Sequence, residues 1–132
     1  MIASQSDRHL RSTMASALLR MGRLPGVIRP CIATPLPNPG RTPTVMVDAG
    51  ANAECTPEML VQFALMGAAF ATARFGTVNP SVGLLSIGEE STKGTPLVKE
   101  THQLLAATEG LNFYGNVEGR DCLLYTSPSP RD

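Results

Sequence analysis

The sequence predicts an α/β fold with a mainly parallel sheet and helices on both faces, an α/β/α arrangement of three layers. Apolar runs that fit strands alternate with longer stretches that fit helices, in the order strand, helix, strand, helix, strand. The run at residues 82–87 carries almost no polar side chain, which is typical of a parallel strand buried on both faces. Right-handed crossovers between such strands place the helices on the two faces of the sheet.

The first part of the chain is expected to hold one helix and two short strands. Residues 10–21 have an apolar side, and the glycines and proline that follow are expected to end this helix. Residues 31–34 are expected to form a short strand, and the proline-rich stretch 35–40 a turn. Residues 44–47 are expected to form the next strand.

A long central helix has a clear start and a clear stop. Thr56 is expected to cap it, Pro57 fits the first helical position, and Glu58 suits the positive end of the helix. Gly76 is expected to end it, after a helix that spans about residues 57–75. Its apolar residues do not fit a single stripe, so it is expected to pack within its own chain or at a subunit contact.

The second part of the chain continues with a strand, a helix and a last strand. The strand at residues 82–87 is followed by a polar loop, after which Thr95 and Pro96 form a second cap and first-turn pair. The last strand is expected at residues 111–114. The buried face of the second helix is expected to carry Leu97, Thr101, Leu104, Leu105 and Thr108.

Three polar, glycine-bearing loops each follow a predicted strand. They read DAGAN at residues 48–52, GEESTKG at residues 88–94 and GNVEGRD at residues 115–121. Ligands of open α/β sheets bind at the carboxyl ends of the strands, so these loops are expected to gather around one site. Lys93 supplies a cation there, and the amides near Thr95 supply hydrogen-bond donors for an anion. The alternative is that the glycines only turn the chain and the charged residues only face water.

Composition excludes several classes of function. The chain has 132 residues and no net charge, which suits one domain or part of one and disfavours a basic nucleic-acid-binding surface. Its three cysteines are odd in number and widely spaced, which disfavours a disulfide framework or a zinc site and favours a reducing compartment. No apolar stretch is long enough to cross a bilayer. No nucleotide-binding or metal-ligand motif is present, so no cofactor and no metal are expected.

Five segments in register closely resemble one bacterial family. They read RPCIATPLP, VDAGAN, PEMLVQFALMGAAFA, VGLLSIGEESTKGTPLVKET and NFYGNVEGRD. Together they are similar to the phosphate acyltransferase of phospholipid synthesis, the PlsX family. The resemblance implies a fold like that of the isopropylmalate dehydrogenase and phosphotransacetylase group, which is Rossmann-like.

The same resemblance implies a reaction and its partners. A fatty acyl group moves from acyl carrier protein to inorganic phosphate, giving acyl phosphate and free carrier protein. A cytoplasmic homodimer is implied, with peripheral association at the inner face of the plasma membrane through an element outside this segment. Phosphate is itself the nucleophile, so the enzyme needs phosphate ligands and oxyanion donors rather than an activated serine or cysteine.

The candidate site residues follow from this reaction and from the three loops. Catalytic roles are expected for Lys93, Asn116 and Asp48. Substrate-binding roles are expected for Asn52, Gly88, Glu89, Glu90, Thr92, Gly94, Thr95, Glu118, Arg120 and Asp121. Lys93 is expected to help hold phosphate or the acyl phosphate, with Glu89 and Glu90 orienting the loop. Turn capping is the alternative for the two asparagines. His102 is expected at a surface or interface rather than as a base, and Cys31 and Cys55 are expected to be packing residues.

Both ends depart from the family pattern. Residues 1–13 contain no glycine where the family carries a glycine-rich loop, and residues 122–132 match nothing in the family. Residues 14–121 are therefore expected to be the central part of an incomplete acyltransferase domain, inactive by itself. A phosphotransacetylase-like enzyme of the same fold group and a remnant without catalytic activity are the alternatives.

Overall fold

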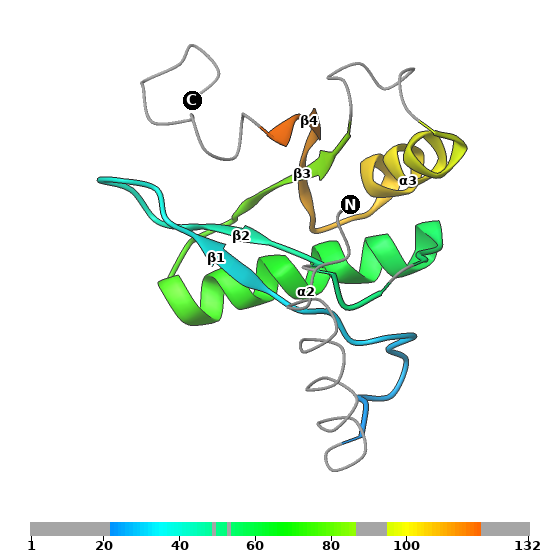
Figure 1. The fold of residues 1–132 in the computed structure, drawn as a ribbon, viewed down its shortest axis with the longest axis horizontal. Helices are drawn as coiled ribbons and strands as arrows, with labels where there is room; N and C mark the ends of the chain where they lie inside the picture. Colours follow the sequence, from blue (N-terminus) through cyan, green and yellow to red (C-terminus); the bar gives the residue numbers. More distant parts are fainter. Residues whose placement is uncertain (1–21, 49, 53, 87–94, 120–132) are drawn as a thin grey trace.

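The chain folds as a mixed α/β structure. The computed structural model describes residues 22–48, 50–52, 54–86 and 95–119 (Figure 1). Along the chain its elements are β1 (Thr34–Leu36), β2 (Thr44–Met46), α2 (Pro57–Phe75), β3 (Ser81–Leu85), α3 (Pro96–Ala107) and β4 (Asn112–Val117). The α/β class is confirmed, whereas the helix predicted at residues 10–21 lies outside the described residues.

The strands form two separate pairs. β3 and β4 are parallel, with Ser81 opposite Asn112, and α3 connects them as the sequence predicts. β1 and β2 are antiparallel, with Thr34 opposite Met46, and they do not pair with β3 or β4. The described strands thus form one parallel and one antiparallel pair, and the three-layer arrangement with a mainly parallel sheet stays a prediction. The short connection between β1 and β2 allows a hairpin but cannot make a parallel crossover.

Strand boundaries also differ from the sequence prediction, most of all for β1 and β4. β1 starts where the expected strand at residues 31–34 should end, and it includes Pro35, which was expected in a turn. Pro35 lies in the first strand of a two-stranded sheet, where a missing N–H is tolerated. β4 runs to Val117 rather than to Tyr114, so Asn116 is a strand residue and not a loop residue.

Both ends of α2 form as the sequence predicts. The Thr56 hydroxyl accepts a hydrogen bond from the Met59 amide at 3.2 Å, and Pro57 follows as the first helical residue. At the other end Gly76 has a φ of 68°, a left-handed conformation that favours glycine, and its N–H bonds to the Thr72 carbonyl. The helix therefore has a fixed start and end relative to the strands on either side of it.

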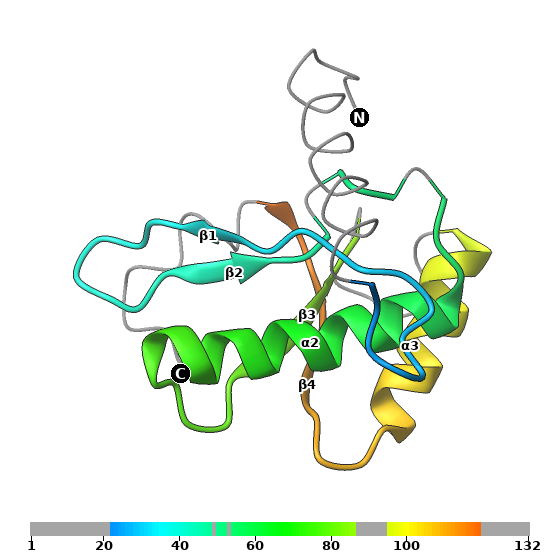
Figure 2. The same ribbon diagram turned by 90° about the horizontal axis from the view of Figure 1, so that it is seen from below.

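The core lies mainly where α2 packs against α3 (Figure 2). Met59, Phe63 and Gly67 are buried at four-residue spacing on α2, and Thr101 and Leu105 are buried at the same spacing on α3. Burying a side chain as large as Phe63 contributes about 1.5–3 kcal/mol. α2 also contacts β2 and β3, which confirms that it packs within its own chain.

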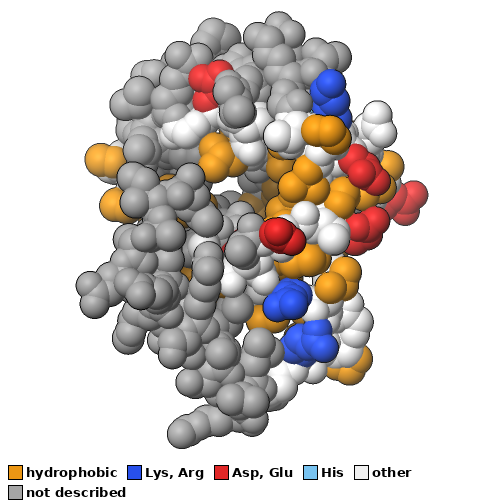
Figure 3. Space-filling view, turned by 45° about the vertical axis from the view of Figure 1, so that its right-hand side comes forward, with side chains coloured by type: hydrophobic (Ala, Val, Ile, Leu, Met, Phe, Trp, Pro, Cys, Tyr) orange, Lys and Arg blue, Asp and Glu red, His pale blue; other side chains and the backbone are white. Residues whose placement is uncertain are grey.

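Burial is less complete than the sequence predicts. β3 was expected to be buried on both faces, but its exposure alternates and Leu85 is 53% exposed. On α3, Leu104 was expected on the buried face but is 37% exposed. On the side drawn in Figure 3, hydrophobic side chains reach the surface between acidic and basic ones. Every second residue of β3, namely Ser81, Gly83 and Leu85, is exposed.

Candidate functional site

The carboxyl ends of β3 and β4 form the edge at which the sequence places a ligand. Leu85 is opposite Val117, and the Ser86 amide donates to the Val117 carbonyl at 2.9 Å, which continues the ladder by one bond. Residues 87–94, which follow, lie outside the described residues, and they include six of the expected site residues, namely Gly88, Glu89, Glu90, Thr92, Lys93 and Gly94.

The N-terminus of α3 directly follows residues 87–94. Thr95 is the cap, and its hydroxyl accepts a hydrogen bond from the Val98 amide at 3.3 Å. Pro96 occupies the first turn, as predicted. The first turn of α3 contains no acidic residue, whereas the first turn of α2 contains Glu58. No acidic residue in this first turn offsets the positive end of the α3 dipole, whereas Glu58 partly neutralises the corresponding end of α2.

Asn116 lies on β4 under α3 and is only 4% exposed. Its Oδ1 lies 2.9 Å from Nδ1 of His102, a residue of α3. Because an amide oxygen only accepts, Nδ1 of this half-buried histidine carries the proton. The imidazole also packs edge-on against Phe113, with 5.1 Å between ring centroids. The sequence does not predict this His102–Asn116 pair, because no spacing rule connects positions on a helix and on the strand after it.

Asp48 and Asn52 form a second cluster, at the end of β2. The Asp48 carboxylate accepts from the Ile32 amide and the Asn52 amide, each at 2.8 Å. The Asn52 side-chain amide donates to the same carboxylate and to the Pro30 carbonyl, each at 3.0 Å. These hydrogen bonds tie the loop at residues 48–52 to the segment before β1. They are the contacts expected for turn capping, the alternative weighed for Asn52.

The charge of Asp48 also acts on two cysteines. Burial, and then the Asp48 charge, raise the pKa of the Cys31 thiol from 9.0 to about 11. The same two causes raise the pKa of Cys55. Both thiols are therefore protonated near neutral pH, the state of packing residues rather than of nucleophiles.

The remaining expected site residues are divided between the strand end and the tail. Glu118 is half-buried and directly follows β4. Arg120 and Asp121 lie outside the described residues. The structure thus brings Asp48 together with Asn52, and Asn116 together with His102, and Thr95 begins the helix that carries His102.

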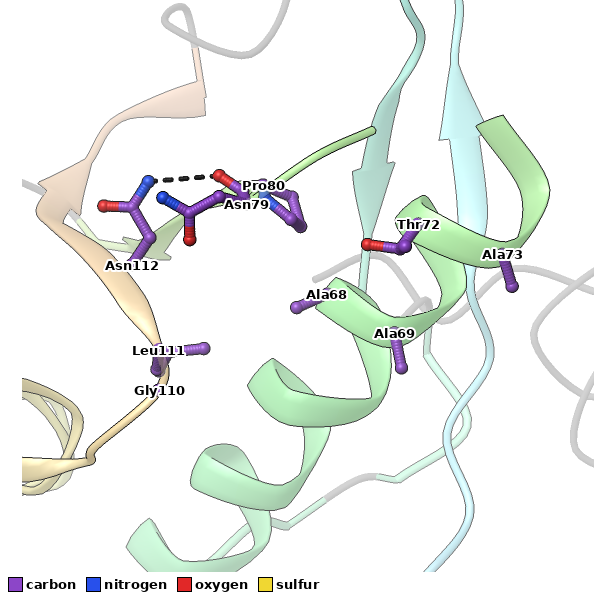
Figure 4. A pocket seen from close by; sticks show the side chains of 9 residues that line it. All are labelled: Ala68, Ala69, Thr72, Ala73, Asn79, Pro80, Gly110, Leu111 and Asn112. Carbon is purple, nitrogen blue, oxygen red and sulfur yellow. Dashed lines mark hydrogen bonds between the residues drawn. The ribbon is translucent and has the colours of Figure 1, made fainter. Parts of the chain in front are cut away.

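Two cavities lie away from the carboxyl edge of β3 and β4. One of about 450 Å³ is bounded by alanines of α2 and by residues that precede or begin β3 and β4 (Figure 4). Asn112 at its rim donates to the Asn79 carbonyl at 3.2 Å. The other, of about 290 Å³, lies between residues 22–33 and α2. The first cavity is at the amino ends of the strands, opposite the expected ligand edge.

The described residues contain neither a group of three or more possible metal ligands from His, Cys, Asp and Glu nor a helix that is long and apolar enough to cross a membrane. These two findings concern the described part of the chain only.

Comparison with known proteins connects this geometry with one family. The sequence profile of the family described as fatty acid synthesis protein matches residues 9–126. A phosphate acyltransferase of Helicobacter acinonychis (strain Sheeba) is 54% identical over 116 residues, which cover 88% of this chain and 34% of that protein. A phosphate acyltransferase of Nostoc sp. is 52% identical over 119 residues, which cover 89% of this chain and 35% of that protein.

A third relative gives the same result. A phosphate acyltransferase of Elusimicrobium minutum is 54% identical over 110 residues, covering 83% of this chain and 32% of that protein. The chain thus spans about a third of the length of the curated relatives it matches. The resemblance found from the five sequence segments is confirmed by these comparisons. The chain belongs to the fatty acid synthesis protein family, the family of the phosphate acyltransferases (PlsX).

Proposed function

We propose that this chain is part of an enzyme that transfers a fatty acyl group from acyl carrier protein to inorganic phosphate. The proposal is supported by relatives named phosphate acyltransferase and by the N-terminus of α3. That helix end is capped by Thr95 and has no acidic residue in its first turn. These properties suit a bound phosphate, which is the substrate that the relatives' name specifies.

The reaction needs positioning more than it needs an activated side chain. A phosphate oxygen attacks the thioester carbonyl carbon, and the carbonyl oxygen carries the negative charge of the tetrahedral intermediate. The C–S bond then breaks, so that acyl phosphate forms and the carrier thiolate leaves and takes up a proton. The protein must hold phosphate near the carbonyl and donate hydrogen bonds to the developing oxyanion.

Within this proposal the loop residues keep the roles inferred from the sequence. Lys93 neutralises phosphate charge, Glu89 and Glu90 orient the loop, and Arg120 and Asp121 contribute to substrate binding. The N-terminus of α3 supplies backbone donors. The full-length protein is proposed to be a cytoplasmic homodimer in which the β3–β4 pair belongs to a three-layer α/β/α domain.

A chimera tests the proposed function. The chimera is the full-length Helicobacter acinonychis relative in which the 116 matching residues are replaced by those of this chain. We call this chimera the full-length host. With acyl carrier protein charged with a fatty acid and with inorganic phosphate, we expect release of the carrier thiol and formation of hydroxylamine-reactive acyl phosphate. The rate should lie within about tenfold of the parent relative, which corresponds to ~1.4 kcal/mol.

Two controls make the outcome decisive. Acetyl-coenzyme A replaces the acyl carrier protein donor, because preference for it would favour a phosphotransacetylase-like enzyme. Circular dichroism and gel filtration establish that the host folds like the parent relative. A folded host that transfers no acyl group to phosphate would overturn the proposal and favour the remnant without activity.

A further inference from the structure

The contact between His102 on α3 and Asn116 on β4 carries an inference about how the site is held in place. We propose that His102 is a positioning residue, which fixes the N-terminus of α3 at the carboxyl edge of the sheet by hydrogen bonding to Asn116. This inference rests on the proposed function, because it assigns a role in phosphate binding to that helix end.

Asn116 lies at the correct level of the sheet for this role. It is opposite Leu84, one residue pair before the last pair of the β3–β4 ladder. At 4% exposure it is not open to a substrate, so an indirect role fits better than direct contact. In this inference Asn116 therefore does not contact the substrate. It acts by holding His102 and, through it, α3.

His102 lies on the same helix as the proposed phosphate donors. Thr95 caps α3, and His102 follows it by seven positions, which is about two turns or ~10 Å along the axis. A hydrogen bond at this point restricts sliding and rotation of the helix. The edge-on packing of the imidazole against Phe113 holds the ring in the orientation that directs Nδ1 at Asn116.

Two side-chain hydrogen bonds of α3 stay within the helix. The Thr101 hydroxyl donates to the Leu97 carbonyl, and the Thr108 hydroxyl donates to the Leu104 carbonyl, each at 2.7 Å. Neither bond connects α3 to the sheet. The His102–Asn116 bond does so, and apolar packing at Leu105 allows small shifts that a directional bond does not.

Such a shift would matter for phosphate more than for the acyl donor. Binding groups must be held within about 0.5 Å of the productive geometry. A helix that slides or rotates moves its N-terminal amides away from phosphate oxygens. The acyl group and its carrier do not depend on these amides in the proposed mechanism. Loss of the bond is therefore expected to raise KM for phosphate and to change KM for the acyl donor little.

Three substitutions at one position separate hydrogen bonding from packing. The side-chain nitrogen of asparagine takes the place of Nδ1, whereas that of glutamine takes the place of Nε2. In the full-length host, His102→Leu and His102→Gln should raise KM for phosphate about tenfold or more. His102→Asn should stay within about threefold of the unsubstituted host, because it restores a donor to Asn116. Gln103→Leu, at the exposed neighbouring position, is the matched control. It should change neither KM for phosphate nor KM for the acyl donor.

A second measurement does not require turnover. Inorganic phosphate should raise the thermal midpoint of the unsubstituted host and of His102→Asn, and raise it less for His102→Leu and His102→Gln. Equal phosphate responses in all variants would overturn the positioning role, even if the host transfers acyl groups normally. Conversely, a host that responds to phosphate in this His102-dependent way but transfers no acyl group would support the inference and contradict the proposed reaction.

Discussion

Val117 of β4 is the diagonal neighbour of Gly83 on the parallel strand β3, and its side chain packs against Gly83. A Cβ atom placed on Gly83 would be 2.7 Å from Cγ1 and 2.9 Å from Cγ2 of Val117. Gly83 is not in a left-handed conformation, so space rather than backbone freedom explains the glycine. The branched side chain of Val117 has few alternative rotamers with which to avoid such an atom.

Gly83→Ala should therefore destabilise the fold. We expect a loss of about 1–3 kcal/mol in the free energy of unfolding of the full-length host, from overpacking between β3 and β4. Gly119→Ala is the matched control, because nothing lies within 4 Å of its added methyl group. Val117→Ala combined with Gly83→Ala should recover part of the loss. Urea unfolding that shows equal stability for Gly83→Ala and Gly119→Ala would contradict this packing.

Removing either of the two helix caps should lower stability equally, but the two removals should differ in their effect on KM for phosphate. Thr56→Ala and Thr95→Ala each remove a cap hydroxyl and should each cost ~1 kcal/mol. In the full-length host only Thr95→Ala should raise KM for phosphate, by about fivefold, because α2 already has Glu58 at its positive end.

A further substitution at the same cap separates helix stability from anion binding. Thr95→Asp keeps a capping oxygen but adds a negative charge, so it should retain stability and still weaken phosphate binding. Steady-state kinetics with varied phosphate measure these constants. A larger phosphate effect for Thr56→Ala than for Thr95→Ala would move the anion site away from α3.

Cys31 should react slowly and with an unusual pH dependence. Its pKa is raised from 9.0 to about 11, so at pH 8 its thiolate fraction is about 100-fold below that of an ordinary thiol. The folded state favours the protonated thiol of Cys31. The contribution of this thiol to the free energy of unfolding is complete below about pH 9 and is lost as the pH rises through about 11.

Alkylation with iodoacetamide, followed by peptide mass spectrometry of the host, measures this behaviour. The labelling rate of Cys31 should keep rising up to about pH 11, and urea should restore the ordinary profile. A rate that levels off near pH 9 in the folded host would show that the thiol is not shielded.

The 132-residue chain by itself should not be a stable monomer. Leu85 and Tyr114 on the β3–β4 pair are about half exposed, and Val78 is almost fully exposed. A few hundred Å² of uncovered apolar surface costs several kcal/mol at ~25 cal/mol per Å², comparable to the stability of a whole domain. We expect gel filtration to show aggregates and urea unfolding to be gradual. A cooperative transition in a monomeric sample would show that the described core is sufficient.

Local signals in the sequence predicted helices better than they predicted sheets. The caps at Thr56 and Thr95 and the stop at Gly76 were correct, because each depends on interactions within a few residues. The pairing of β1 with β2 was missed, because strand pairing depends on residues that are distant along the chain. Alternation of buried and exposed residues on β3 was missed for the same reason, since what covers a face cannot be read from the strand itself.

The candidate site shows the same division. The capped helix start at Thr95 follows from a short motif and was correct. The partners of Asp48 and Asn116 did not follow, because their hydrogen bonds join segments that only the fold brings together. The roles predicted for Lys93 and its neighbouring loop residues stay predictions.

The arrangement of β3, α3 and β4 has a consequence for synthesis in the cell. β3 leaves the ribosome before its partner strand exists, and its apolar side chains then have no covering element. Even when β4 has paired with it, each of these two strands has one edge without a partner strand among the described residues. Such edges can accept a strand from another nascent chain. Slow translation through this region would therefore favour binding by holdase chaperones, and rapid overproduction would favour inclusion bodies.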